Sequence, residues 1–226
     1  MYIPEHFEQP DPQVVRQLIA ERPLGALVTM TSRGLDANHI PFIFHEKLGS
    51  PGLLHGHIAR VNPLLTQVSR DVNAMVIFRG PDKFISPSWY PTKWETGKVV
   101  PTWNFAVVHM HGPLRFIDDT RWIRSHVEEM TNLHEASRPA PWKVTDAPAD
   151  YIDQLLSALV GLELTVERVD AKWKASQNRS AEDRHGVVRG LMHEGTPAAV
   201  EMADLVRQED RRIAIGAANE QQEEKR

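Results

Sequence analysis

The pattern of apolar and polar positions changes character about halfway along the chain. Between residues 24 and 117, short runs such as "LGALVTM" (24–30) and "NAMVIFRG" (73–80) are rich in β-branched and aromatic residues, and turn signals such as Gly-Pro-Asp (80–82) separate them. Six or more of these runs, with one short helix at "LLTQVSR" (64–70), predict a closed or partly closed antiparallel barrel. We therefore expect residues 24–117 to form a barrel core.

Helical spacing of apolar residues dominates the second half of the chain. The elements predicted there are helices within residues 118–160, a returning strand at 162–173, a C-terminal helix at 197–212 and a disordered polar tail at 214–226. A further helix is predicted near the start, where Asp11 and Pro12 form an N-cap pair. The whole pattern predicts a mainly β fold with flanking helices, of the α+β class, in a single domain over residues 1–213.

Composition and charge narrow the class of protein. Hydrophobic residues make up 41% of the 226 positions and charged residues 25%, which is typical of soluble globular proteins. No stretch approaches the ~20 apolar residues of a membrane helix, so no membrane partner is expected. The first twelve residues lack the basic and apolar segments of a signal peptide, which favours the cytoplasm. The chain has no cysteine, which excludes disulfides and thiolate metal sites.

Two His-x-His pairs leave three interpretations open. His55 and His57 lie in "LLHGHIARVNP", and His109 and His111 lie in "VVHMHGP"; residues two apart on a strand share one face. Four imidazoles could bind zinc, nickel or copper, or they could be hydrogen-bonded core residues. The glutamate that follows His-x-His in cupin-like metal sites is missing after His57, and Arg60 would repel a cation there. The sequence therefore predicts no metal ligand.

The third interpretation is an anion site at residues 56–62. Gly56 lets a ligand approach the backbone, Arg60 supplies a guanidinium, and Asn62 caps a short helix whose amides favour negative charge. No nucleotide-binding glycine motif accompanies them. Elsewhere, "VPTWNF" supplies an aromatic plane and the amide of Asn104, which are either core residues or the flank of a planar ring.

Several segments, taken in order, resemble the PaiB-type proteins. They are "YIPEHF", "GHIARVNP", "FISPSWY…K", "VPTWNFAVVHMHG" and "KASQNR", within residues 1 to about 192. PaiB-type proteins are FMN-binding members of the pyridoxamine-phosphate-oxidase-like split barrels, often called negative transcriptional regulators. The resemblance implies a split β-barrel homodimer that binds FMN in clefts between its subunits.

The resemblance also implies which residues contact the flavin. Asn38 and Ile40 would offer backbone groups beside the isoalloxazine, residues 56–62 would hold the phosphate and ribityl chain, and "KASQNR" would close over the cofactor. His109, and less directly His111, would lie near the flavin. The predicted cofactor-binding residues are Asn38, Ile40, Gly56, His57, Arg60, Asn62, Asn104, His109, Lys174, Gln177 and Arg179. No catalytic residue is assigned.

Two functions follow from this resemblance. One is a flavin-binding regulator that acts indirectly, because a net charge of −4 and the lack of a helix-turn-helix signature do not favour direct DNA binding. The other is an FMN-dependent oxidoreductase with an unknown small-molecule substrate, or a haem-binding relative. His39, His57 and His109 are its candidate acid–base groups.

Overall fold

A computed structural model describes residues 1–69 and 73–223, so Arg70, the last residue of the predicted short helix, lies outside the described residues. The strands are β1 (Leu24–Thr31), β2 (Gly34–Pro41), β3 (Ile43–Lys47), β4 (Ser50–Ala59), β5 (Ala74–Ile85), β6 (Thr102–Gly112), β7 (Leu114–Ile117), β8 (Leu159–Val166) and β9 (Arg168–Lys174). The α-helices are α1 (Pro12–Glu21), α2 (Leu64–Gln67), α3 (Thr92–Thr96), α4 (Thr120–Glu135), α5 (Ala149–Ser157), α6 (Ala181–Glu194) and α7 (Pro197–Glu223). Three short 3-10 helices are η1 (Glu5–Phe7), η2 (Pro87–Trp89) and η3 (Val144–Asp146).

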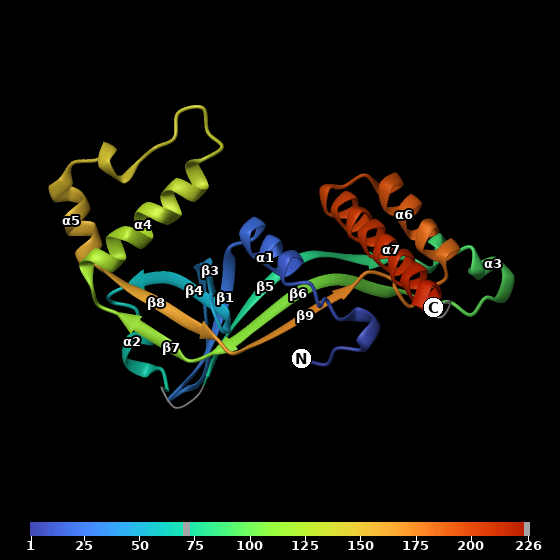
Figure 1. The fold of residues 1–226 in the computed structure, drawn as a ribbon, viewed down its shortest axis with the longest axis horizontal. Coiled ribbons are helices and arrows are strands. Elements are labelled where there is room, and N and C mark those ends of the chain that lie inside the picture. Colours follow the sequence, from blue (N-terminus) through green and yellow to red (C-terminus); the bar gives the residue numbers. More distant parts are fainter. Residues whose placement is uncertain (70–72, 224–226) are drawn as a thin grey trace. The chain divides into compact units, whose positions relative to one another are not determined.

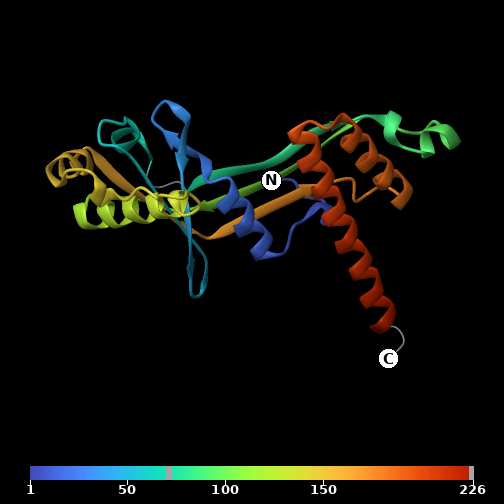
Figure 2. The ribbon, with the colours of Figure 1, turned by 90° about the horizontal axis from the view of Figure 1, so that it is seen from above.

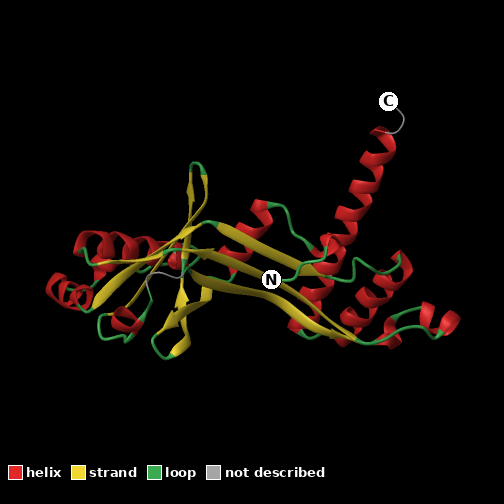
Figure 3. Ribbon diagram, turned by 90° about the horizontal axis from the view of Figure 1, so that it is seen from below, coloured by secondary structure: helices red, strands yellow, loops and turns green. Residues whose placement is uncertain are grey.

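The described strands form two sheets with flanking helices, and they do not close into one barrel (Figure 3). One sheet has the order β2-β1-β5-β6-β9, and the other has the order β3-β4-β8-β7. The pairs β1–β2, β3–β4, β4–β8 and β7–β8 are all antiparallel. The α+β class predicted from the sequence is confirmed.

Two chain segments cross between the sheets at the same place. Pro113 separates β6 from β7, and Glu167 separates β8 from β9. The backbone N–H of Glu167 donates to the carbonyl of His111 at 2.9 Å, and that of Thr165 donates to the carbonyl of Pro113 at 3.2 Å. A Cβ on Gly112 would lie 1.8 Å from the carbonyl oxygen of Thr165, so only glycine fits this crossing. The single returning strand expected at 162–173 is therefore two strands, one in each sheet.

The expected turn at residues 80–82 is also different in the structure. Strand β5 runs without interruption through Gly80, Pro81 and Asp82. Proline adopts the extended backbone conformation and only lacks the donor N–H, so a strand accommodates it where that donor is not required. The sequence signal for a turn was therefore overridden by strand pairing.

The chain divides into two compact units, each assembled from segments distant in sequence. Unit 1 contains residues 1–11, 79–108 and 171–226, and unit 2 contains residues 12–78 and 109–170. Strands β5, β6 and β9 each contribute residues to both units. The single domain over residues 1–213 stays a prediction.

In unit 2, α4 and α5 pack together beside the four-stranded sheet (Figure 1). Ile123, Val144, Ile152 and Leu156 form their shared apolar cluster. Helix α4 begins near the start of the predicted helical range 118–160, because the Asp119 side chain accepts from the backbone N–H of Arg121 at 2.8 Å and of Trp122 at 3.2 Å. Gly161 of β8 lies directly under Trp122, and a Cβ there would lie 2.3 Å from the indole ring.

In unit 1, α6 and α7 pack along each other, and α7 is one long helix (Figure 2). Helix α6 ends at Gly195, whose φ of 68° is left-handed. Helix α7 continues past residue 212, where the sequence predicted its end, through the good helix formers Ala, Gln and Glu to Glu223. Residues 224–226 of the predicted tail lie outside the described residues. No described helix has the length and apolar character needed to cross a membrane.

Candidate functional site

The first His-x-His pair faces helix α4. The His55 ring lies 5.1 Å from the ring of Trp122 and 4.3 Å from that of His45. Its Nε2 lies 3.1 Å from Oε2 of Glu163, the residue opposite it on β8. His55 therefore belongs to a packed, hydrogen-bonded layer between the sheet and the helix.

His57 continues this layer and contacts His126 of α4. The two ring centroids are 5.3 Å apart, and His126 stacks on Trp122 at 5.3 Å with an interplanar angle of 16°. His126 is 3% exposed, and neither of its ring nitrogens has a hydrogen-bond partner within the described part of the chain. Burial and, to a smaller extent, the neighbouring His57, His55 and His45 lower the pKa of His126 to about 3. The imidazole is therefore neutral at pH 7. The spacing of His57 gave no signal for this contact, which depends on where α4 docks.

Arg60 is engaged by other residues of unit 2. Its two terminal nitrogens donate to the carboxylate of Asp118 at 2.9 and 2.7 Å. Its Nε donates to the carbonyl of Ser157 at 2.9 Å, and one terminal nitrogen also donates to the carbonyl of Leu159 at 3.0 Å. The hydrogen bond from Arg60 lowers the pKa of Asp118, which keeps the carboxylate ionised. An anion at Arg60 would have to take the place of Asp118.

Two predicted residues, Asn38 of β2 and Asn62, do lie together. The Nδ2 of Asn62 donates to the Oδ1 of Asn38 at 3.1 Å, and the Oδ1 of Asn62 accepts from the backbone N–H of Leu64 at 2.9 Å. The Nδ2 of Asn38 donates to Asp36 at 2.9 Å. This pair links the edge strand β2 to the turn after β4.

The outward backbone groups of β2 are those of its odd-numbered residues. The N–H of Phe42 donates to the carbonyl of Pro23 at 2.9 Å, and hydrogen-bonded pairs alternate along an antiparallel ladder. In the observed register, Ile40 opposite Gly25 and Asn38 opposite Leu27 are therefore hydrogen-bonded to β1. The backbone groups that point away from β1 belong to Ala37 and His39. The resemblance had implied free backbone groups at the adjacent Asn38 and Ile40.

Gly56 and Ile40 belong to the apolar core. Ile40 is 4% exposed. A Cβ on Gly56 would lie 3.0 Å from the ring of Phe42 and 3.1 Å from the side chain of Ile40. The missing side chain of Gly56 therefore makes room for Phe42 and Ile40.

Four predicted residues come together in unit 1. Asn104 is fully buried, and its Nδ2 donates to the Oγ of Ser176 at 2.9 Å. In the "KASQNR" segment, Lys174 bonds Thr102, and Gln177 bonds the backbone at Ala175 and Trp173. Arg179 lies 4.8 Å above the ring of Tyr90. The Oδ1 of Asn104 is buried and has no partner among the residues that the structure describes.

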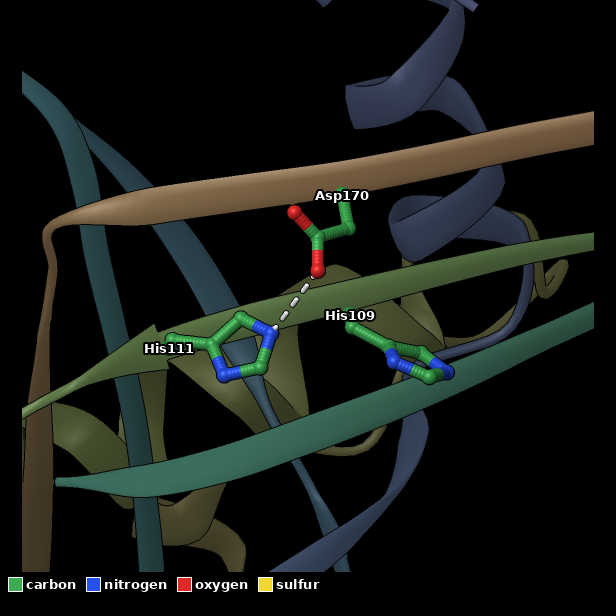
Figure 4. Close-up of side chains that lie close together, drawn as sticks. All are labelled: His109, His111 and Asp170. Carbon is green, nitrogen blue, oxygen red and sulfur yellow. Dashed lines mark hydrogen bonds and ion pairs between the residues drawn. The ribbon is translucent and has the colours of Figure 1, made fainter. Parts of the chain in front are cut away.

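The second His-x-His pair meets a carboxylate on the neighbouring strand. Figure 4 shows His109 and His111 of β6 beside Asp170 of β9, and the Nε2 of His111 lies 3.2 Å from Asp170 Oδ2. One ligand atom of each residue lies within 4.8 Å of the other two. Burial lowers the pKa of His109, and the neighbouring His111 lowers it further. The sequence did not point to Asp170 as a site residue, because no feature of residues 162–173 shows which strand β9 pairs with.

The comparisons with known structures define the class of fold. The flavocytochrome Anf3 from Azotobacter vinelandii has a TM-score of 0.54 at 12% identity and covers 81% of this chain and 78% of its own. The FAD and haem binding protein from Mycobacterium smegmatis has a TM-score of 0.54 at 15% identity and covers 81% of this chain and 80% of its own. The fold is of the split β-barrel type.

Sequence relatives then define the family. The model of a family described as "Putative FMN-binding domain" matches residues 1–168. The Bacillus subtilis "Protease synthase and sporulation protein PAI 2" is 30% identical over 206 residues, which cover 91% of this chain and 96% of the relative. The chain belongs to this PaiB-type family of FMN-binding-domain proteins.

Proposed function

We propose that this protein binds FMN and acts in regulation without contacting DNA. The observation that carries FMN binding is the match of residues 1–168 to the FMN-binding domain family. Bound FMN would supply the redox chemistry, and the residues of this chain would bind the cofactor, orient it and exclude water from it.

The chemistry of two residue sets fits this cofactor. In unit 2, Arg60 already holds a carboxylate with two parallel N–H donors, and phosphate accepts the same geometry. The resemblance also implies Asn38, Ile40, Gly56, His57, Asn62 and His109 of unit 2, although Ile40 and Gly56 belong to the apolar core. In unit 1, the buried Oδ1 of Asn104 is an acceptor without a partner among the described atoms, which suits a donor N–H of a flavin ring. Lys174, Gln177 and Arg179 complete that set.

Titration with three flavins tests the proposal. Purified full-length chain is stripped of bound flavin and titrated with FMN, riboflavin and FAD, and the quenching of flavin fluorescence is followed. Each charge-assisted hydrogen bond to phosphate contributes about 1.5–3 kcal/mol, so FMN should bind at least about tenfold more tightly than riboflavin. Equal affinity for FMN and riboflavin would refute phosphate recognition, and no binding of any flavin would refute the function.

We also propose a homodimer. Tyr151 and Leu155 of α5 are 54% and 46% exposed, although Ile152 and Leu156 of the same helix are buried. Exposed large apolar side chains beside a core are typical of surfaces that a second subunit covers. Light scattering of the FMN-bound protein should give twice the chain mass of 25.6 kDa. A monomer that holds FMN tightly would contradict this proposal.

Indirect regulation is supported by the ion pairs on α6 and α7, which engage two of the four arginines that line the groove between these helices. Arg184 pairs with Asp210 at 2.6 Å, and Arg207 pairs with Asp204 at 2.8 Å. Arg189 and Arg211 line the same groove between these helices. Specific DNA binding normally uses several phosphate contacts and is therefore steeply salt-dependent. Competitor-resistant binding to a regulated promoter in a gel shift at physiological salt would overturn indirect regulation.

The second candidate is a flavin-dependent oxidoreductase or a haem-binding protein. It is favoured by the names of the two structural neighbours, one a flavocytochrome and the other an FAD and haem binding protein. The absorbance spectrum separates the candidates, because a Soret band indicates haem and flavin bands alone indicate FMN or FAD.

A further inference from the structure

The side chains of His109, His111 and Asp170 lie close together on two neighbouring strands. The two histidines lie on the same face of β6 because they are two residues apart. Asp170 projects from β9, the neighbour of β6 in the five-stranded sheet. Figure 4 shows the His111 ring directed at the Asp170 carboxylate, with the His109 ring to one side of them. One ligand atom from each of the three lies within 4.8 Å of the others.

These distances are close to those of a metal centre. Nitrogen and carboxylate ligands bind Zn²⁺ at about 2.0–2.2 Å, which places tetrahedral ligand atoms about 3–3.5 Å apart. The Nε2 of His111 and Oδ2 of Asp170 are already 3.2 Å apart. His109 would approach them by a rotation of its side chain.

The burial of the Asp170 carboxylate favours a cation at this point. The side chains of His111 and Asp170 are only 19% and 15% exposed, so water screens the carboxylate weakly. Two imidazoles and one carboxylate are the ligand set of Zn²⁺ and of Fe²⁺, Co²⁺ or Ni²⁺ rather than of Mg²⁺ or Ca²⁺.

Arg168 supplies a positive charge at the same point. One terminal nitrogen of Arg168 lies 3.0 Å from the Nε2 of His111, and its Nε lies 3.3 Å from Oδ1 of Asp170. The guanidinium therefore occupies lone pairs that a metal ion would use. Its side chain is 62% exposed, so it can turn into solvent without unpacking the sheet.

We propose that His109, His111 and Asp170 bind a divalent transition metal such as Zn²⁺, which displaces the guanidinium of Arg168. Three protein ligands leave at least one coordination position open to water or an exogenous ligand. The site gives His109 a role separate from the flavin contact that the family resemblance implies.

The test uses the full chain, free of any affinity tag, after treatment with a chelator. Zn²⁺ affinity and stoichiometry are measured by competition with a chromophoric chelator, and Co²⁺ is added as a spectroscopic probe. We expect one Zn²⁺ per chain. The bound Co²⁺ should show the visible absorption bands of a four- or five-coordinate ion. Asp170→Asn and His111→Asn should each weaken Zn²⁺ binding at least about tenfold. His134→Asn, which removes an exposed histidine of α4, is the matched control and should bind Zn²⁺ as the unaltered chain does.

Arg168→Gln gives a test that does not depend on damaging the site. Removal of the displaced cation should tighten Zn²⁺ binding several-fold. Damage to the fold would weaken binding, so it cannot account for this result. FMN affinity measured in Asp170→Asn should equal that of the unaltered chain, which separates this site from the flavin site. Unchanged Zn²⁺ affinity in both Asp170→Asn and Arg168→Gln, or equal loss in His134→Asn, would overturn the proposal.

Discussion

Arg60 and Asp118 form a bidentate ion pair with N–O distances of 2.9 and 2.7 Å. The pair joins the end of β4 to the segment between β7 and α4. If Arg60 also binds the flavin phosphate, Asp118 competes with that phosphate for the same two donors. This competition makes the role of Arg60 measurable.

Asp118→Asn should therefore increase the affinity for FMN, because the phosphate no longer has to displace a carboxylate from the guanidinium of Arg60. Arg60→Gln should lower the affinity for FMN about 10- to 100-fold and leave the affinity for riboflavin unchanged. Fluorescence titrations of both variants with both flavins measure the effect. Parallel losses of FMN and riboflavin affinity in Arg60→Gln would mean that Arg60 acts through folding and not through the phosphate.

Asn104 provides a complementary test, because its proposed contact is with the flavin ring. Asn104→Ala should weaken binding of FMN and riboflavin by the same factor. Ser176→Ala is the matched control, because it removes the same 2.9 Å hydrogen bond but keeps the buried Oδ1 of Asn104. If the two variants lose flavin affinity equally, the amide oxygen has no direct role.

The histidine layer beneath α4 predicts that stability falls in acid. The pKa of His126 is lowered to about 3 in the folded protein, and burial also lowers the pKa of His57. The unfolded chain titrates near the ordinary value of 6.5, so below that pH it binds more protons than the folded chain does. The stability is therefore full above pH 6.5 and is lost as the pH falls from 6.5 towards 3. The slope from His126 is at most about 1.4 kcal/mol per pH unit.

Urea unfolding at a series of pH values measures this dependence. His126→Leu should flatten the slope in this interval, because the buried titrating group is gone. The exposed His134→Asn should leave it unchanged. Glu129 and Glu163, which also adjoin the layer, remain in both variants. An unaltered slope in His126→Leu would show that other groups cause the acid sensitivity.

Two helical glycines provide a matched test of packing in unit 1. A Cβ on Gly190 of α6 would lie 2.3 Å from the ring of Trp89, whereas a Cβ on Gly216 of α7 would meet nothing within 4 Å. Gly190→Ala should lower the free energy of unfolding by about 1–3 kcal/mol, because the indole must move. Gly216→Ala should leave it unchanged or raise it by up to about 1 kcal/mol, because alanine favours the helix. Thermal and urea unfolding would measure both, and equal effects would contradict the contact with Trp89.

The sequence by itself determined the features that depend on neighbouring residues. Helices were predicted from residue 118 onwards, and the cap of α4 is local because the Asp119 side chain accepts from backbone amides two and three residues further on. The shared faces of His55 with His57 and of His109 with His111 follow from strand geometry alone. The order of the family motifs was likewise readable along the chain, and the family is confirmed.

Only the tertiary structure decided which of these local features meet. Asp170 lies beside His111, Asp118 pairs with Arg60, and His126 contacts His57. At least 58 residues separate Arg60 from Asp118 and His111 from Asp170. Such contacts depend on strand order and on where a helix docks, and these are decided by burial of the whole core. For the same reason, β5 continues through Gly80 and Pro81, and the strand predicted at 162–173 is divided between two sheets.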